Sequence, residues 1–362
     1  MVSRVTTAVL VVIGALTMFC TAATAGTADF QDPYKVPAVK SPLAEKTLLQ
    51  GIARAGTRLV AVGWRGHILY SDDQGKSWTQ TDAPVSSDLL AVSFPSPLMG
   101  WAVGHAGIVL HTTDGGVTWT KQLDGRAAGQ IMTSYYAEHP PMNISEGSEE
   151  MEMFMMEVER FGTEGLENPF LDVWFESDTT GFIVGTFNSI FRTTDGGKSW
   201  EPWYDRTENP ERNHLYMIRP VGDDLFISSE RGLALKFDRQ SGQFRRMDVP
   251  CIGSFFGHTG VSPVVILYGM VGNVFRSGDS GASWNKIETG MVATGVMGST
   301  VTEDGRVVLV NGAGQVLISA DGGENFKIIR ADKPFPLTGV VEGGKGELVL
   351  TGFGGVQVQK VK

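Results

Sequence analysis

Cysteine is nearly absent from this sequence, because Cys20 and Cys251 are the only two in 362 residues. Cys20 ends an apolar stretch that follows a single Arg and precedes the small residues Ala23-Thr24-Ala25. This pattern predicts a secretory signal peptide over residues 1–25, with a lipoprotein at Cys20 or an uncleaved N-terminal anchor as alternatives. The mature domain, residues 26–362, then has one thiol, which excludes an internal disulfide and leaves packing to stabilise the fold. We expect Cys251 itself to lie in a buried strand.

Runs of basic residues are also missing. Lys and Arg number 30 against 40 Asp and Glu, so the net charge is −10, and no stretch alternates basic with aromatic residues. This charge balance argues against nucleic acid as a partner. The six His residues lie apart and show none of the spacings that hold a metal ion. We therefore expect no metal and no cofactor.

Glycine, in contrast, is abundant and regularly placed. A hairpin of the form G-x-x-G, or a close variant, recurs seven times, and the last residues of successive copies are 41, 81, 44, 40, 42 and 41 residues apart. Short β-rich runs surround each copy, and a period near 40 residues with four runs per unit is typical of a β-propeller. The hairpins are Gly63–Gly66, Gly104–Gly107, Gly185–Asn188, Ser229–Gly232, Gly269–Gly272, Asn311–Gly314 and Gly352–Gly355.

The sequence predicts an all-β, seven-bladed β-propeller with one interruption. The anomalous spacing of 81 residues indicates a partly helical insertion, residues 127–168, between the second and third blades. The last unit, from Leu337 onward, supplies only three strand-like runs. We expect Tyr34–Val39 to pair with it as a fourth strand, because closing the ring removes exposed sheet edges.

A polar turn that ends in an aromatic residue follows five of the seven hairpins. It has the form S/T-x-D-x-G-x-S/T-W/F, with Asn325 as an exception in the last copy, and we call it the Asp-box turn. Its Asp can accept backbone N–H groups, its Gly permits positive φ, and its aromatic ring can wedge between sheets. These turns lack the spacing of a calcium loop or a phosphate-binding loop, and one acid repeated around a ring indicates architecture rather than catalysis. The predicted structural residues are Asp73, Gly75, Trp78, Asp114, Gly116, Trp119, Asp195, Gly197, Trp200, Asp279, Gly281, Trp284, Asp321, Gly323 and Phe326.

Residues 127–168 differ from the repeats in composition, with nine Glu, one Arg and six of the chain's fourteen Met. Ser148 followed by two Glu predicts a helix start, since a hydroxyl can cap the first turn and acids favour that end. An apolar face of this helix either packs on the propeller or holds a partner. The candidate partner-binding residues on that face are Met151, Phe154, Met155 and Val158.

The segments Val103–Trp119 and Val184–Trp200 combine the hairpin with an Asp-box turn five residues later. This combination resembles the photosystem II stability and assembly factor family, whose cyanobacterial and plant members are seven-bladed lumenal propellers. The resemblance implies a monomeric, non-catalytic scaffold that binds membrane-protein subunits through an arginine-rich surface. The implied client is a photosystem II-like subunit or, in a bacterium without photosystems, an inner-membrane exporter. The implied location is the thylakoid lumen or the periplasm, at or near the membrane.

No motif maps the arginines of this chain onto that surface. Arg65 and Arg231 are our candidates for contact with a partner. The other arginines considered are Arg54, Arg58, Arg206, Arg212, Arg245 and Arg246.

Asp boxes also occur in sialidases, so the alternative is a sialidase-like glycoside hydrolase or a carbohydrate-binding propeller. A sialidase-like site needs an arginine cluster, a Tyr–Glu pair and an acidic proton donor. Tyr216, Glu230 and Arg231 could be fitted into such a site, yet no motif singles them out. The segment Met217-Ile-Arg-Pro220 is only a weak counterpart of the Phe-Arg-Ile-Pro segment of that family. We therefore predict that the protein is not an enzyme.

Overall fold

The structure, a computed structural model, describes residues 31–142 and 144–361. The predicted signal peptide, residues 1–25, lies outside the described residues. From Asp32 onward the described chain forms one compact unit built from seven antiparallel sheets. The strands of each sheet are hydrogen-bonded in chain order, so each sheet is a meander.

Six sheets have four strands and the seventh has three. The first sheet contains β1 (Leu49–Ala55), β2 (Arg58–Gly63), β3 (Ile68–Ser71) and β4 (Thr79–Gln80), and the second contains β5 (Leu89–Ser93), β6 (Gly100–Gly104), β7 (Val109–Thr112) and β8 (Thr120–Leu123). The third contains β9 (Phe170–Phe175), β10 (Gly181–Gly185), β11 (Ile190–Thr193) and β12 (Glu201–Pro202), and the fourth contains β13 (Leu215–Val221), β14 (Asp224–Ser229), β15 (Ala234–Asp238) and β16 (Gln243–Arg246). The fifth contains β17 (Phe255–Thr259), β18 (Val265–Gly269), β19 (Val274–Ser277) and β20 (Asn285–Lys286), and the sixth contains β21 (Val296–Val301), β22 (Val307–Asn311), β23 (Gln315–Ser319) and β24 (Lys327–Arg330). The seventh contains β25 (Leu337–Glu342), β26 (Glu347–Gly352) and β27 (Gly355–Lys360).

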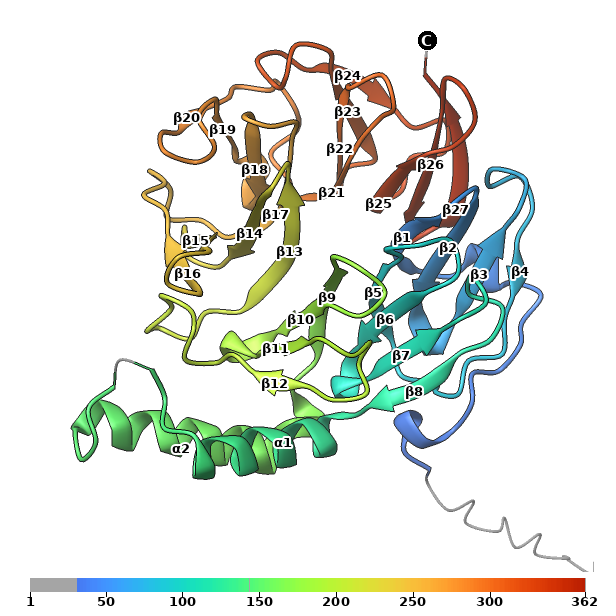
Figure 1. Cartoon of the computed structure of the whole chain (residues 1–362). Coiled ribbons are helices and arrows are strands. Elements are labelled where there is room, and N and C mark those ends of the chain that lie inside the picture. Colours follow the sequence, from blue (N-terminus) through green and yellow to red (C-terminus); the bar gives the residue numbers. More distant parts are fainter. Residues whose placement is uncertain (1–30, 143, 362) are drawn as a thin grey trace, which may run out of the picture. The chain divides into compact units, whose positions relative to one another are not determined.

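The seven sheets form a closed ring (Figure 1). The first strand of each sheet lies nearest the centre and contacts the first strand of the next sheet, and β25 contacts β1 in the same way. At this last junction the Thr338 hydroxyl donates a hydrogen bond of 2.6 Å to the carbonyl of Leu49. The predicted seven-bladed β-propeller is confirmed, and its ring closes by packing of one sheet on the next.

Aromatic packing between neighbouring sheets holds the ring together. The rings of Trp101 and Phe175, on the second and third sheets, stack with centroids 3.5 Å apart. Phe182 and Phe244 meet edge to face between the third and fourth sheets. Such pairs add to the stabilisation that comes from burying their apolar area. Cys251 is half-buried in the loop between β16 and β17, so the expectation that it lies in a buried strand was wrong.

The hairpins between the second and third strands show why Gly recurs in the sequence. A Cβ on Gly104 would lie 2.1 Å from the carbonyl oxygen of Asp88, and the His105 N–H donates to that same oxygen at 2.9 Å. Gly107 adopts a φ of 62°, which residues with a side chain resist. Four hairpins end in single 3-10 turns, namely η3 (Trp64–Gly66), η4 (His105–Gly107), η6 (Thr186–Asn188) and η7 (Met270–Gly272).

The N-terminal segment does not complete the seventh sheet. Tyr34–Val39, which we expected to be its fourth strand, overlaps the 3-10 turn η1 (Pro33–Lys35) and lies beside the second sheet instead. The Ala38 N–H donates to the carbonyl of Ala83, and the buried ring of the segment's tyrosine lies 5.5 Å from Lys121 Nζ. The prediction was wrong because burial of this ring and its cation contacts favour another site.

Two helices fill the connection between β8 and β9 and lie side by side (Figure 1). They are α1 (Gly125–Glu138) and α2 (Glu149–Glu164), followed by the 3-10 turn η5 (Gly165–Glu167). Ser148 Oγ accepts the Met151 N–H at 3.1 Å, so the helix start predicted at Ser148 is confirmed. The sequence reasoning missed α1, which the carboxylate of Asp124 caps. None of the helices described is both long enough and apolar enough to cross a membrane.

Candidate functional site

The Asp-box turns connect the third and fourth strands, and their carboxylates bind the turn itself. In the second sheet, Asp114 Oδ1 accepts the N–H groups of Val117 and Thr118 at 3.0 and 2.9 Å, and Oδ2 accepts the Thr118 hydroxyl at 2.6 Å. The Thr112 hydroxyl donates to Asp114 Oδ1 and accepts the N–H of Gly116, whose φ is 87°. The carboxylate thus satisfies donors that the turn would otherwise leave unpaired.

The four other Asp-box turns repeat this arrangement. Each carboxylate accepts the N–H of the residue four positions on, together with the hydroxyl of that residue in three turns and the Asn325 side-chain amide in the last. The aromatic residues Trp119, Trp200 and Trp284 are buried beside the preceding sheet. The hydroxyl and N–H of Ser77, followed by the Ser71 hydroxyl, lower the pKa of Asp73 to about 2. A carboxyl group held so firmly as an anion cannot donate a proton near neutral pH. These contacts account for the Asp-box residues without any chemical step.

The hairpins and the Asp-box turns lie at opposite ends of the strands. The hairpins connect the second strand to the third, and the Asp-box turns connect the third to the fourth. In a meander, successive connections lie at opposite ends, so the links from one sheet to the next share the end of the hairpins. The insertion is one of these links. We call this end of the ring, with the seven hairpins defined above, the hairpin face.

Arg65 and Arg231 occupy equivalent positions on the hairpin face. Each is the third residue of its hairpin, in the first and fourth sheets, and each adopts a left-handed backbone with φ of 55° and 52°. Both side chains are exposed, and neither guanidinium forms an ion pair with any residue that the structure describes. The Arg65 backbone is fixed by its N–H, which donates to Asp88 Oδ1 at 2.8 Å. These two positions therefore present positive charge from a fixed backbone to an anionic partner.

Large apolar side chains accompany these arginines on the hairpin face. They sit at hairpin tips of the first, third, fifth and seventh sheets and are between 41% and 61% exposed. These side chains lie on four different sheets and add apolar contact area to the hairpin face. The residues are Trp64, Phe187, Met270, Val271 and Phe353.

The six other arginines differ from Arg65 and Arg231 in position, in pairing or in both. Arg54 and Arg58 lie near the opposite end of the first sheet, where Arg58 pairs with Asp72 at 2.7 Å. Three others are engaged in ion pairs, Arg206 with Glu201, Arg212 with Glu157 and Arg245 with Glu208. Arg246 is exposed at the end of β16. Among these eight arginines, only Arg65 and Arg231 combine a position in a hairpin with the lack of an ion pair among the described residues.

A Tyr–Glu pair lies on the hairpin face where the fourth sheet meets the centre of the ring. The Tyr216 hydroxyl donates to Glu230 Oε1 at 3.2 Å, and the His214 N–H donates to Glu230 Oε2 at 2.9 Å. Burial and the neighbouring Glu230 raise the pKa of Tyr216 to about 12. A tyrosine nucleophile needs the opposite shift, because its phenolate must form readily. The structure thus brings Tyr216 and Glu230 together, but none of the described arginines bonds to either.

The apolar face of α2 packs inside the protein. Phe154 and Val158 are buried in a core cluster with residues of α1 and the third sheet, while Met151 and Met155 are half-buried. Burial therefore supports packing, the first of the two roles left open for this face, and contact with a partner stays a prediction. The exposed residues of α2 are others, among them Met156 at 63%.

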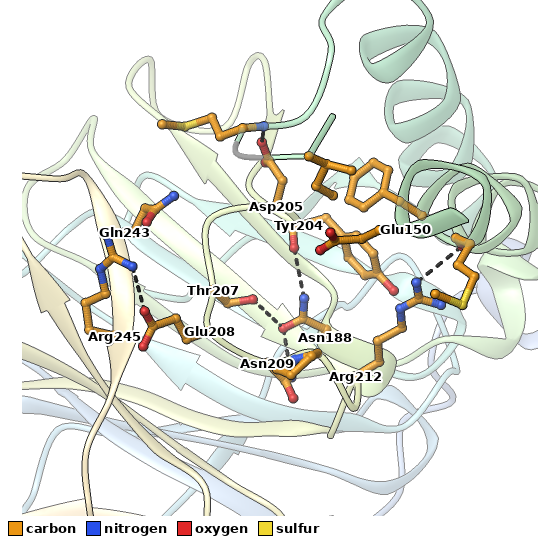
Figure 2. A pocket seen from close by; sticks show the side chains of 15 residues that line it. Glu150, Asn188, Tyr204, Asp205, Thr207, Glu208, Asn209, Arg212, Gln243 and Arg245 are labelled. Carbon is orange, nitrogen blue, oxygen red and sulfur yellow. Dashed lines mark hydrogen bonds and ion pairs between the residues drawn. The ribbon is translucent and has the colours of Figure 1, made fainter. Parts of the chain in front are cut away.

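A pocket of about 580 Å³ lies between the insertion and the third and fourth sheets (Figure 2). Its polar groups bond mainly to one another. Asn188 Oδ1 accepts from Thr207 Oγ1 and Asn209 Nδ2, both at 2.9 Å, and Asp205 accepts the Met142 N–H at 2.7 Å. The Tyr136 hydroxyl of α1 donates to the other oxygen of Asp205. The two bonds to Asp205 attach the insertion to the propeller. Among the residues described, no group of three His, Cys, Asp or Glu side chains is placed to hold a metal ion.

Comparison with known proteins gives one family match. A model of the family described as photosynthesis system II assembly factor YCF48 matches residues 46–134 and 160–286, more than half of the chain. The break between the two matched segments falls within the insertion. No curated protein sequence matches the chain.

Solved structures share the fold at low identity. A structure described as YCF48 bound to D1 peptide has a TM-score of 0.61 and 16% identity, covering 92% of this chain and 98% of that one. YCF48 from Cyanidioschyzon merolae has a TM-score of 0.62 and 15% identity over 87% of this chain and 96% of its own. A streptogramin B lyase has a TM-score of 0.65 and 9% identity over 92% and 100%. Because the last of these is a lyase, the fold alone does not decide between binding and catalysis.

Proposed function

This chain belongs to the photosystem II assembly factor YCF48 family, and from that premise we propose that it is an exported, non-catalytic scaffold that binds a subunit of a membrane-protein complex. A solved relative holds a D1 peptide, which supports a client segment of peptide character. The client is a photosystem II-like subunit or an inner-membrane exporter. The protein acts as a monomer in the thylakoid lumen or the periplasm, at or near the membrane.

We place the client on the hairpin face. The observation that carries this proposal is the pair Arg65 and Arg231, two exposed arginines with no ion pair among the described residues, at equivalent hairpin positions. Exposed apolar side chains flank them. Apolar contacts with a flexible segment supply affinity, and the two arginines of this acidic protein, whose net charge is −10, select acidic groups of the client.

Charge reversal tests this placement. The variant Arg65→Glu/Arg231→Glu should bind a synthetic D1 peptide, and subunits from detergent-solubilised membranes, at least about ten-fold more weakly than the wild type. The matched control is Lys198→Glu/Lys345→Glu, which reverses two exposed charges at the opposite end of the strands. Calorimetry of both variants, with melting temperatures recorded, separates binding from folding. Equal affinities for the two variants would rule out the hairpin face as the docking site.

The alternative function, a sialidase-like hydrolase, rests on one observation, the hydrogen bond from Tyr216 to Glu230. The raised pKa of Tyr216 and the absence of an arginine bonded to the pair among the described residues argue against it. We expect no release of fluorophore from a fluorogenic sialoside. Turnover that disappears in Tyr216→Phe, while the melting temperature stays unchanged, would establish the hydrolase instead.

A further inference from the structure

The seventh sheet is the one that departs from the repeat. It ends at β27, whereas every other sheet continues to a fourth strand. Among the residues described, none forms a strand beside the outer edge of β27. A sheet edge presents unpaired backbone donors and acceptors, and an extended segment can pair with it.

The register of β27 shows which backbone groups face outward. β27 pairs with β26 so that Leu350 lies opposite Gln357 and Leu348 opposite Gln359. The N–H of Val361 donates to the carbonyl of Gly346, which continues the same register two residues further. Hydrogen-bonded pairs alternate along an antiparallel ladder, so the odd-numbered residues of β27 bond to β26. The N–H and C=O groups of the even-numbered residues, Val356, Val358 and Lys360, therefore face outward, and of these the Lys360 carbonyl already accepts the Gln359 side chain at 3.0 Å.

The outermost strands elsewhere show what a fourth strand does at this position. Gln122 of β8 donates a hydrogen bond of 2.9 Å to Gly196 in the Asp-box turn of the next sheet. Met247, which directly follows β16, lies against Gly281 of the next Asp-box turn. The fourth strand of one sheet thus covers the Asp-box turn of its neighbour.

The Asp-box turn of the first sheet, which lies beside the seventh sheet, is less covered. Its aromatic residue, Trp78, packs with Val356 and Val358 of β27. Trp78 is half-buried, whereas Trp119 is buried, at 5% exposed, beside a four-stranded sheet. An unpaired edge and a partly uncovered indole therefore coincide at one place on the rim of the ring. This place is the open edge, and we define it by Val356, Val358, Lys360 and Trp78.

We propose that the open edge binds an extended segment of a partner protein, which adds to the seventh sheet as its fourth strand. Residues opposite Val356 and Val358 would bond to β27 and point their side chains to the same face, toward Trp78. These residues are therefore apolar and alternate with polar ones. The segment has acidic flanks, because three lysines that form no ion pair within the described residues border the edge, namely Lys76, Lys333 and Lys360.

The described N-terminal segment touches the open edge at one end, where Ala44 shares a core cluster with Trp78 and Val356, but it forms no strand beside β27. Its first turn, η1, lies beside the second sheet, where Ser86 donates to the carbonyl of Pro33. The chain then passes β4 without pairing with it as a strand. The Ser41 N–H donates a hydrogen bond to the Gln80 side chain there. It meets β27 only through η2 (Ala44–Lys46), at the end where β27 begins. The open edge is separate from the hairpin arginines, so this inference goes beyond the proposed function.

A designed peptide tests strand addition directly. The probe is an acetylated and amidated octapeptide, Glu-Val-Thr-Val-Thr-Val-Thr-Glu, added to the mature protein while binding is measured by calorimetry and amide hydrogen exchange is followed. We expect saturable binding and slower exchange of the Val358 amide. Methylation of the valine amides, which face β27, should weaken binding by at least about ten-fold, whereas methylation of the threonine amides should leave it nearly unchanged.

Two protein variants complete the test. Val358→Pro removes one outward N–H without touching the bonds to β26, a substitution that edge strands tolerate, and should weaken probe binding as strongly as valine methylation does. Arg65→Glu/Arg231→Glu should bind the probe as the wild type does. A wrong client site on the hairpin face and a wrong open edge would therefore give different results. The proposal is overturned if the probe does not bind, if both methylated peptides bind equally, or if the Val358 amide is already protected in the free protein. Protection without peptide would mean that another part of the chain, or a second copy, occupies the edge.

Discussion

Gln122 on β8 joins the second sheet to the third, because its Nε2 donates to the carbonyl of Gly196 at 2.9 Å while its Oε1 accepts the indole N–H of Trp101 at 3.0 Å. Trp101 is fully buried. A Cβ on Gly197 would lie 2.3 Å from the same Oε1, so the turn and the side chain fit closely. One amide group thereby satisfies a buried donor and holds a neighbouring Asp-box turn.

Replacement of Gln122 should therefore weaken the whole ring. Gln122→Ala leaves the buried Trp101 N–H unpaired, and we expect the free energy of unfolding to fall by about 2 kcal/mol in urea titrations. The matched control is Gln130→Ala, which removes an exposed glutamine from α1 and should change stability by less than about 0.5 kcal/mol. Equal effects of the two changes would show that the contact between sheets contributes nothing measurable.

The Asp-box carboxylates should matter for stability and not for binding. Asp114→Ala removes the acceptor of four hydrogen bonds, and we expect it to lower the free energy of unfolding by about 1–2 kcal/mol. Asp195→Ala should have the same effect. Affinity for the D1 peptide should stay within about two-fold of the wild type, since the turns and the hairpin face lie at opposite ends of the strands. Lost affinity with unchanged stability would assign these residues to a binding site.

These carboxylates also predict how stability depends on pH. Hydrogen bonds lower the pKa of Asp73 and of Asp279 to about 2, below the value near 3.9 that an unfolded chain has. A lowered pKa contributes stability that is complete above about pH 4 and is lost as the pH falls toward 2. The variant Asp73→Asn/Asp279→Asn should therefore unfold at a lower temperature at pH 7 and lose less stability between pH 4 and pH 2. Parallel pH profiles of the variant and the wild type, followed by circular dichroism, would contradict this assignment.

The repeat could be predicted from the sequence because its signals are local. Gly104 indicates a hairpin because the backbone of the preceding strand approaches it too closely for a side chain. Ser148 indicates a helix start because its hydroxyl accepts the N–H of the residue three positions later. The seven copies, 40–44 residues apart except across the insertion, then determine the number of sheets. Turns and helix caps depend on residues that are close in sequence, so a single sequence is enough to predict them.

Contacts across the ring could not be predicted in this way. Nothing in Tyr34–Val39 indicated that its tyrosine would be buried beside the second sheet rather than pair with the seventh. The missed helix α1 has a cap at Asp124, but its two early glycines, Gly125 and Gly129, weaken the helical signal. Both glycines are needed because α1 approaches the backbone near Gly162 and Gly165 too closely for a Cβ. Which arginines form ion pairs and which stay exposed likewise became known only from the structure.

The hairpin glycines should be far more sensitive than glycines of the insertion. A Cβ at Gly104 would meet the backbone of Asp88 and Leu89, so Gly104→Ala must displace the hairpin, and we expect a loss above about 3 kcal/mol or failure to fold. Gly147 has a positive φ of 72°, unlike Gly104, but nothing lies within 4 Å of its added Cβ. Gly147→Ala should therefore lose only about 1 kcal/mol. Chemical denaturation compares the two, and similar losses would mean that the close approach at Gly104 costs no more than the left-handed backbone at Gly147.

The insertion offers a last comparison, between a buried and an exposed residue of one helix. Phe154 packs edge to face on Tyr136 of α1 and on Tyr204 of the third sheet, so Phe154→Ala should lower the free energy of unfolding by about 3–4 kcal/mol. Met156 is 63% exposed, and Met156→Ala should leave stability unchanged. If the insertion only braces the third sheet, Met156→Ala and the replacement of residues 129–165 by a short Gly/Ser linker will both retain client recovery from membranes, provided that the shortened protein still folds. Loss of client in Met156→Ala at an unchanged melting temperature would instead show that the outer side of α2 contacts the partner, and that the buried face serves to hold it in place.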